Sequence, residues 1–295
     1  MKPGFLNTSK TLNLTKKPLL MGILNVTPDS FSDGGKYFKL DTALKHTQDM
    51  INQGVDIIDV GGESTRPGAK PVSEEEELNR VIPVIKEISL LATHHLLLIS
   101  VDTYKSNVAK LALDNGANMI NDVSGLTMDE NMVKVAREAN CPIVIMHNRG
   151  IPATKPENEP RHCEGSLTPL GTGSAISKTL GDCRVVHHGW TPRNDITEEV
   201  YTWLKNQTDF AIRNGVKKEN IIIDPGIGFG KSPEEDLILL ENLKEFESLG
   251  FPVLAGPSKK SFIRRLFPNH DLKIKSKEMI ELAIKNGASI VRIHL

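Results

Sequence analysis

The chain has 295 residues, of which 39% are hydrophobic and 25% are charged, and its formal net charge is −1. This composition predicts a single folded domain over 1–295 with a sizeable core. A near-neutral charge gives no electrostatic basis for a nucleic-acid partner. No apolar run approaches the ~20 residues that a membrane span requires, so we expect no membrane partner either.

The cysteines and the first residues indicate the compartment. The 3 cysteines have no paired metal-ligand spacing, and their odd number argues against a disulfide framework. A reducing, cytoplasmic setting is therefore the prediction. Residues 1–28 contain Lys and Thr but no acidic residue, which faintly resembles a transit peptide. The lack of Arg there, and the direct passage into an apolar run, favour the cytoplasmic interpretation.

Apolar runs that predict buried strands alternate with segments of helical periodicity. Strands are predicted at 19–24, 56–60, 96–101, 117–120, 142–146, 221–223, 251–255 and 288–293. Helices are predicted at 41–53, 73–89, 105–115, 129–139, 196–214, 234–248 and 277–286. Ser73 and Glu76 form a capping-box pattern, and Pro83 predicts a kink or a division in the second helix. The stretch 151–195 is irregular and long, which indicates a functional loop or an insertion.

Eight predicted strands with helices between them imply right-handed crossovers and a parallel sheet. We predict an α/β fold, a (β/α)₈ TIM barrel, with a doubly wound open sheet as the alternative. The chain ends at Leu295, directly after the last strand, so the barrel lacks the eighth helix. We therefore expect apolar surface to be exposed beside Ile23 and Ile290, in a chain that is either truncated or unstable.

Polar side chains stand at or just after the carboxyl ends of most predicted strands. In a (β/α)₈ barrel these ends converge on one pocket. The residues concerned are Asn25, Glu63, Asp102, Asn121, Asp122, His147, Asp224, Lys260, Arg292 and His294.

One group of these residues suits a heterocycle. Asp102, Asn121 and Asp224 supply hydrogen-bond acceptors, and Asn121 can also donate. Together they would fit a flat, nitrogen-rich ring that bears an amino group. The plainer interpretation of any single Asp at a strand end is that it caps the following helix.

A second group suits an anion. Arg292 and His294 alternate along the last strand and therefore face the same way. With Asn25, a neutral oxygen ligand, they would fit a phosphate or a Mg²⁺–phosphate, and Lys260 could serve either group.

The motifs at these strand ends resemble those of the dihydropteroate synthase family. Asn-Val-Thr-Pro-Asp-Ser-Phe-Ser-Asp-Gly-Gly at 25–35 resembles its first signature, and Gly-Gly-Glu-Ser-Thr-Arg-Pro-Gly at 61–68 resembles its second. Further matching motifs lie, in family order, at 100–103, 120–123, 224–231, 258–263 and 291–294. The resemblance covers 19–294 apart from 151–195.

The resemblance implies a transferase of folate synthesis. In this family 4-aminobenzoate is joined to 6-hydroxymethyl-dihydropterin diphosphate, which gives dihydropteroate and pyrophosphate, by an SN1-like route with Mg²⁺ as cofactor. Sulfonamides compete with the aminobenzoate. The implied partners are thus small-molecule substrates, and a homodimer is left open.

The resemblance also implies a role for each matching residue. The pterin site would comprise Asp102, Asn121, Met146, Asp224, Lys260 and Arg292, with Asp224, Lys260 and Asp102 as catalytic residues. Asn25, Arg292 and His294 would bind the diphosphate, with Asn25 as the metal ligand. The aminobenzoate site would be bordered by Thr65, Arg66, Pro67, Phe229 and Ser261.

Two other functions fit a pterin-binding barrel. One is the transfer of a methyl group from methyltetrahydrofolate to a corrinoid protein, but such domains lack the two signature loops that this chain has at 25–35 and 61–68. The other is a non-catalytic pterin-binding protein, which a turnover assay would distinguish.

Overall fold

The computed structural model describes residues 18–27, 36–64, 69–92, 97–150 and 195–295. Within them, eight parallel strands form one sheet in the order β6-β5-β4-β3-β2-β1-β8-β7. A bridge between Ile223 and Val253 links β6 to the segment before β7 and closes the barrel. The strands are β1 (Leu19–Asn25), β2 (Ile57–Gly61), β3 (Leu98–Asp102), β4 (Met119–Asp122), β5 (Ile143–Met146), β6 (Ile221–Asp224), β7 (Leu254–Ala255) and β8 (Ile290–Ile293).

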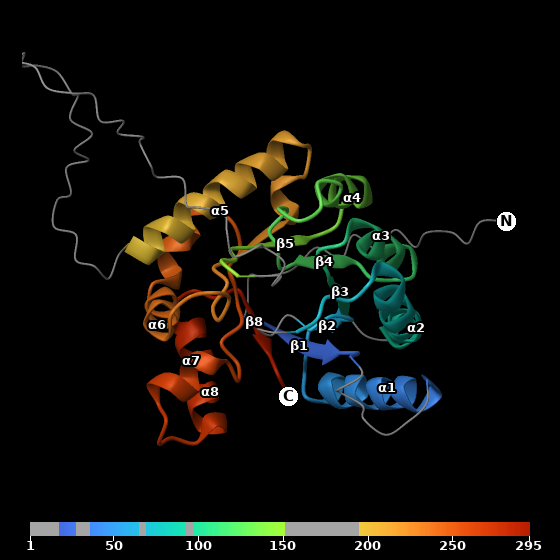
Figure 1. Ribbon diagram of the computed structural model, residues 1–295, viewed down its shortest axis with the longest axis horizontal. Coiled ribbons are helices and arrows are strands. Elements are labelled where there is room, and N and C mark those ends of the chain that lie inside the picture. Colours follow the sequence, from blue (N-terminus) through green and yellow to red (C-terminus); the bar gives the residue numbers. More distant parts are fainter. Residues whose placement is uncertain (1–17, 28–35, 65–68, 93–96, 151–194) are drawn as a thin grey trace, which may run out of the picture.

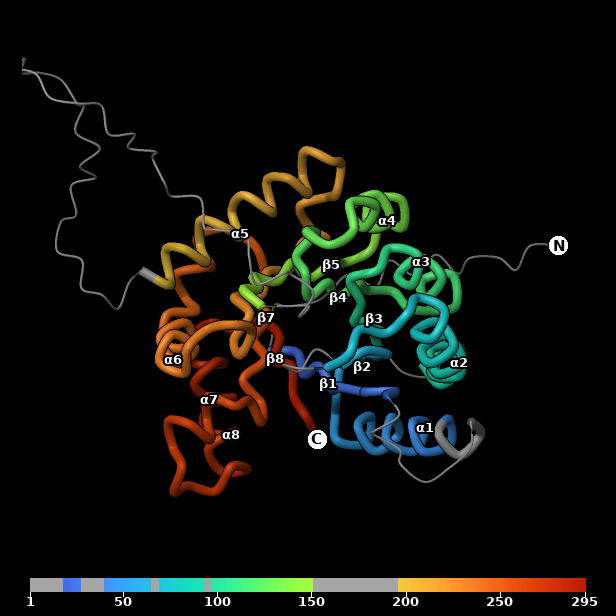
Figure 2. Tube along the Cα trace, in the orientation of Figure 1, coloured from blue at the N-terminus to red at the C-terminus, as the bar shows by residue number. Residues whose placement is uncertain are grey.

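The helices surround this barrel in chain order, as Figure 1 and Figure 2 show. The predicted (β/α)₈ architecture is therefore confirmed. The helices are α1 (Lys36–Asn52), α2 (Glu74–Ala92), α3 (Ser106–Asp114), α4 (Met132–Ala139), α5 (Asp195–Arg213), α6 (Pro233–Glu241), α7 (Ser261–Leu266) and α8 (Leu272–Lys285). Two 3₁₀ segments, Lys218–Asn220 and Leu243–Leu249, complete them.

Several predicted boundaries differ from the structure for local reasons. Helix α2 is not divided at Pro83, because that ring lies on the exposed side while Val84 and Ile85 face the core. Helix α7 follows Lys260 where the sequence indicated only a loop, since six residues are too few for a periodic signal. The helix predicted over 234–248 ends at Glu241 and continues as 3₁₀ turns.

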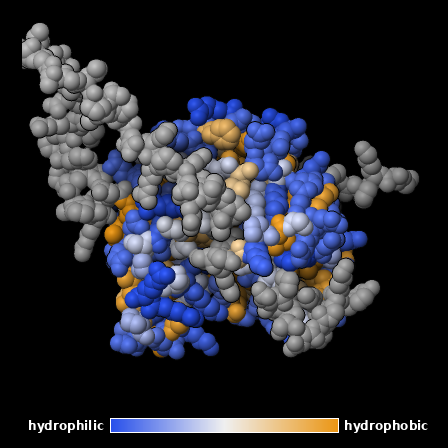
Figure 3. All heavy atoms as spheres, viewed as in Figure 1, coloured by the Kyte–Doolittle hydropathy of each residue, from blue (hydrophilic) through white to orange (hydrophobic). Residues whose placement is uncertain are grey.

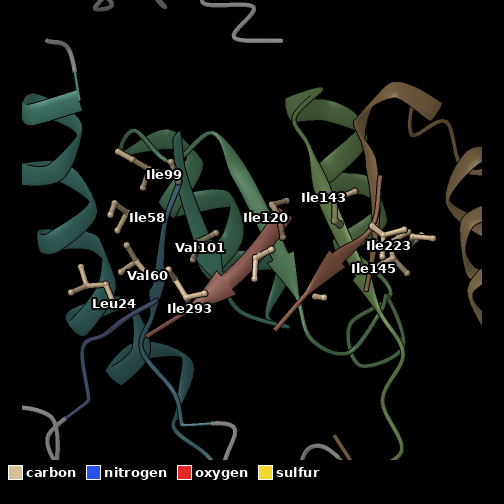
Figure 4. Close-up of a cluster of buried hydrophobic side chains, with 14 of the residues drawn as sticks. Leu24, Ile58, Val60, Ile99, Val101, Ile120, Ile143, Ile145, Ile223 and Ile293 are labelled. Atoms are coloured by element: carbon tan, nitrogen blue, oxygen red, sulfur yellow. The ribbon is translucent and has the colours of Figure 1, made fainter. Parts of the chain in front are cut away.

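The outward side chains of the strands form the main core with the helices. Figure 4 labels ten of them on β1 to β6 and β8, all of them aliphatic. Side chains alternate between the two faces of a strand, so the residues between them point into the barrel. On β2, for example, Ile58 and Val60 face the helices while Ile57 and Asp59 face inward.

The amino-terminal half of the barrel interior is filled by apolar side chains, one from each strand. We call this layer the floor. All its members have relative exposures of 8% or less, and they form a cluster separate from the outer core. The floor consists of Met21, Ile57, Leu98, Met119, Val144, Ile222, Leu254 and Ile290.

The last strand is followed only by His294 and Leu295, and the helix before it, α8, joins β7 to β8 after the short helix α7. The expectation of exposed apolar surface beside Ile23 and Ile290 is wrong. Their outward-facing neighbours Leu24 and Val291 have relative exposures of 1% and 0%. Ile23 and Ile290 themselves face the barrel interior, with relative exposures of 7% and 0%. Period-two alternation assigns them to the inner face, so a helix outside the barrel would not cover them.

The face shown in Figure 3 is largely hydrophilic over its described residues, with apolar side chains in small separate groups. Within the described ranges, no helix is both long enough and apolar enough to cross a membrane.

Candidate functional site

At the next inward positions after the floor, several strands carry polar side chains, whereas β1 and β5 carry Ile23 and Met146 there. We call Asp59, Asn121, Asp224 and Arg292 the polar layer, because each stands two residues beyond a floor residue on its strand and bears an amide or a charged group. Asp59 has a relative exposure of 0%, Asn121 of 3% and Asp224 of 5%. Groups of this kind are retained in a protein interior only where partners compensate for their lost hydration. We therefore expect the residues of the polar layer to have hydrogen-bonding or charged partners inside the barrel.

The guanidinium of Arg292 links Asp59 in the polar layer to Asp102 at the end of β3. Its Nε donates to Asp59 Oδ2 at 2.7 Å, and its Nη2 donates to Asp102 Oδ2 at 2.5 Å. Asn121 Nδ2 also donates to Asp59 Oδ2, at 3.0 Å. Strands β2, β3, β4 and β8 thus meet in one hydrogen-bonded network, which brings together three residues predicted for the pterin site.

Asp102 titrates near neutrality in this network. Burial, together with the negative charges of Asp59 and Glu77, raises the pKa of Asp102 to about 7 against the opposing charge of Arg292. The carboxyl group can therefore exchange a proton at physiological pH, which suits contact with the ring nitrogens of a heterocycle.

Asp224 ends β6 and is fixed by the turn that follows it. Gly226 N donates to Asp224 Oδ1 at 2.7 Å. Gly226 has a φ of +70°, and a Cβ there would collide with the carbonyl oxygen of His147, so glycine is required. Burial raises the pKa of Asp224 to about 6, although this backbone bond and Lys260 favour the charged form. Asp224 therefore remains mostly ionised at neutral pH.

Lys260 directly precedes helix α7, and its positive charge favours the ionised form of Asp224. Its Nζ lies 3.9 Å from the centroid of the Phe229 ring, a cation–π geometry. Burial lowers the pKa of Lys260 to about 8, with Arg292 acting in the same direction and Asp224 opposing it. Phe229 also packs with Met146 and Val123 in a small apolar cluster at the carboxyl end of the barrel. The predicted residues Met146, Phe229 and Lys260 thus lie together.

Asn25 is the last residue of β1, and its side chain and that of Asp102 both lie close to Gly61. A Cβ on Gly61 would lie 3.6 Å from Asp102 Oδ2 and 3.7 Å from Asn25 Oδ1. His294 follows β8, and its backbone N donates to the buried Ser258 Oγ at 3.2 Å.

Ser261, predicted for the aminobenzoate site, is exposed at the start of α7. Thr65, Arg66 and Pro67 lie outside the described residues.

The start of the second signature loop is anchored by residues that the sequence reasoning did not single out. Lys105 Nζ donates to Glu63 Oε2 at 2.6 Å and to Glu77 Oε2 at 2.5 Å. The hydroxyl of Tyr104 donates to Glu63 Oε1 at 2.9 Å. Glu63 was a strand-end candidate without a role, and the structure shows it bound to the segment after β3 and, through Lys105, linked to Glu77 on α2.

His147, another strand-end candidate, is buried against Trp203, with ring centroids 5.1 Å apart. Burial, together with the nearby positive charges of Lys231 and Arg149, lowers the pKa of His147 to about 3, so the ring is neutral. Asp122 accepts hydrogen bonds from Ser124 N, Ser124 Oγ and Leu126 N, which identifies it as a turn-forming residue. Neither residue joins the polar layer.

Asp59 is the main residue that the sequence reasoning missed. The strand-end criterion excluded it because it lies in the middle of β2. The available signal was a lone charged residue within the run Ile-Ile-Asp-Val, since a charge inside a buried strand requires a partner.

Comparison with known proteins agrees with this geometry. The family model described as pterin binding enzyme matches residues 21–168 and 178–294. A dihydropteroate synthase from Bacillus subtilis is 43% identical over 286 residues, with 96% of this chain and 85% of the relative covered.

Two solved structures are similar over most of their length. Dihydropteroate synthase from Clostridium difficile, crystallised in the presence of pteroic acid, has a TM-score of 0.74 and 41% identity, covering 94% of this chain and 91% of its own. The enzyme from Xanthomonas albilineans with 4-aminobenzoic acid has a TM-score of 0.74 and 35% identity, covering 94% of this chain and 88% of its own.

Proposed function

The chain belongs to the dihydropteroate synthase family of pterin-binding enzymes, and we propose that it condenses 4-aminobenzoate with (7,8-dihydropterin-6-yl)methyl diphosphate. The products are 7,8-dihydropteroate and pyrophosphate, a step of folate biosynthesis. The observation that carries the proposal is the buried network in which Arg292 joins Asp59 and Asp102 beside Asn121. Such a network at the carboxyl ends of barrel strands is suited to a small polar ring.

The pterin is recognised by its nitrogen-bound hydrogens. Asp102 and Asp224 offer carboxylate oxygens, and Asn121 can offer its amide oxygen while its Nδ2 is held by Asp59. An amino group and ring N–H groups would satisfy these acceptors. Met146 would contact the ring from the apolar cluster it shares with Phe229.

The bond-breaking step leaves positive charge on the pterin methylene group. In an SN1-like reaction the carbon–oxygen bond to the diphosphate breaks first, and the amine of 4-aminobenzoate then attacks the cation and loses a proton. Asp224, largely ionised at neutral pH, is placed to stabilise that cation electrostatically. Lys260 and Asp102 are the further catalytic residues that we propose, since both titrate close to neutrality.

The diphosphate would be bound by Asn25, His294 and the positive field of Arg292. Among the described residues there is no group of three or more His, Cys, Asp or Glu side chains that could hold a metal ion. One amide oxygen, from Asn25, nevertheless suits Mg²⁺, which usually keeps several waters and takes substrate phosphates as ligands. When bound, Mg²⁺ would neutralise charge on the departing pyrophosphate.

The aminobenzoate would lie over Phe229 and Ser261, with Thr65, Arg66 and Pro67 as the proposed remainder of its site. Sulfonamides would compete for this position. A cytoplasmic location and a homodimer stay predictions.

Pyrophosphate release tests the proposal. The purified chain is incubated with the pterin diphosphate and Mg²⁺, with and without 4-aminobenzoate, and both pyrophosphate and dihydropteroate are measured. We expect stoichiometric formation of both products only when 4-aminobenzoate is present. Pterin binding without turnover would instead favour the non-catalytic function, and methyl transfer from methyltetrahydrofolate to a corrinoid protein would favour the methyltransferase.

A further inference from the structure

Asp59 is a fully buried charged residue in the middle of a strand. Its relative exposure is 0%, and its neighbours across the sheet are Ile23 on β1 and Ser100 on β3. Removing a carboxylate from water costs several kcal/mol unless hydrogen-bonded partners compensate. The stability of the fold alone would be served better by an apolar residue of similar volume, like Ile57 in the floor.

Two hydrogen bonds to the Asp59 side chain converge on one oxygen. Oδ2 accepts from Arg292 Nε at 2.7 Å and from Asn121 Nδ2 at 3.0 Å, while Oδ1 has no partner among the described residues. The donors come from β8 and β4, on opposite sides of β2 in the sheet order. Asp59 therefore connects two predicted substrate contacts that are remote from each other in sequence.

The contact with Asn121 decides which end of the amide is available. An amide side chain can present either its NH₂ or its oxygen to a ligand. A carboxylate can only accept, so Asp59 holds Nδ2 and leaves Oδ1 of Asn121 for a donor elsewhere. Without Asp59, the two orientations of the amide would differ much less in energy.

The contact with Arg292 fixes the plane of the guanidinium. Nε is held by Asp59 and Nη2 by Asp102, so the planar group is attached at two points from two strands. A fork held in this way has one orientation, whereas a single hydrogen bond would leave it free to rotate.

We propose that Asp59 is a positioning residue of the pterin site, which sets the orientation of the Asn121 amide and the plane of Arg292. This inference rests on the proposed function, since it assigns Asp59 to the same pocket. The pocket that results presents acceptors, and it therefore selects rings whose edge carries several N–H donors.

The test is calorimetric binding of 6-hydroxymethylpterin, which lacks phosphates, to the full chain and its variants. Asp59→Ala should weaken binding about 10- to 100-fold, the range for hydrogen bonds to charged groups. Asp59→Asn keeps an oxygen of the same shape and should weaken it less, about 3- to 10-fold. Ser100→Ala is the matched control, because Ser100 is the cross-strand neighbour and its Oγ has no partner in the described part of the chain.

Steady-state kinetics provide a readout that a merely structural role would not change. The KM for the pterin diphosphate should rise in both Asp59 variants, whereas the KM for 4-aminobenzoate should stay within about twofold. In an Asn121→Ala background, Asp59→Asn should lose the part of its effect on pterin binding that acts through the amide and keep the part that acts through Arg292, so the two effects should be less than additive.

Each outcome decides one question. If the wild-type chain binds the pterin and folded Asp59 variants bind it equally well, or if the Asp59→Asn and Asn121→Ala effects simply add, the positioning role is excluded. If Asp59→Ala does not fold, pterin binding by Asp59→Asn and the double-mutant cycle of Asp59→Asn with Asn121→Ala still test the positioning role. Failure of the wild-type chain itself to bind the pterin would overturn the proposed function, and this inference with it.

Discussion

The floor and the polar layer are built from the same strands but differ in what they contribute. On β6, the floor residue Ile222 and the polar-layer residue Asp224 are separated by one residue and face the same interior. On β2, Ile57 and Asp59 have the same relation. The backbone is equivalent at both levels, so the contrast arises from the side chains alone.

The floor stabilises the fold, whereas the buried carboxyl groups in and just above the polar layer destabilise it. Each floor side chain is removed from water without any polar group, which stabilises the fold by about 1.5–3 kcal/mol. In the polar layer burial raises the pKa of Asp224, and just above the layer it raises that of Asp102. The folded state thus disfavours the charged forms that substrate recognition uses. The apolar floor offsets this cost directly beneath it.

The largest effect is expected from the polar layer. Asp224→Asn keeps the shape and the turn at Gly226 but removes the charge, so turnover should fall roughly 10²–10⁴-fold while the fold remains intact. Pyrophosphate release and a melting curve measure the two properties separately. Near-normal turnover in the folded variant would remove Asp224 from the mechanism.

The floor should give the opposite result. Ile222→Ala leaves a cavity in the closed interior and should lower the free energy of unfolding by about 2–5 kcal/mol. The turnover number of the protein that remains folded should change by no more than a few-fold, because no charge is moved. Urea unfolding and the same kinetic assay test this. A large loss of turnover without a loss of stability would show that the two layers are not distinct.

The sequence predicted the floor and the strand ends better than the layer between them. Apolar runs identified all eight strands, because buried parallel strands are continuously apolar. The strand-end criterion found Asn121 and Asp224, although β4 extends two residues further than predicted and includes Asn121. It could not find Asp59, whose role depends on Arg292, 233 residues away in the chain.

The sequence also could not predict the hydrogen-bond partners of Arg292. Its position on the last strand suggested an anion ligand next to His294. In the structure its guanidinium binds Asp59 and Asp102, contacts that depend on the barrel closing through β1 and β8. The roles of Thr65, Arg66 and Pro67 stay predictions, since these residues lie outside the part of the chain that the structure describes.

The smallest expected effect is a pH dependence that distinguishes the same two variants. Burial raises the pKa of Asp224 from its ordinary 3.8 to about 6, so between these values the folded protein holds a proton that the unfolded chain has lost. The stability of the wild-type chain should therefore fall as the pH rises through this window, and this contribution should be constant above it.

Asp224→Asn cannot titrate at this position and should not show that fall. Relative to the variant, the wild-type chain should lose about 1 kcal/mol of stability between pH 5 and pH 8. Ile222→Ala retains Asp224, so its difference from the wild-type chain should be the same at both pH values. Urea unfolding of the three proteins at the two pH values measures this. If the difference between Asp224→Asn and the wild-type chain were also the same at both pH values, burying the Asp224 carboxylate would not destabilise the fold. The floor and the polar layer would then differ in chemical role but not in their contribution to stability.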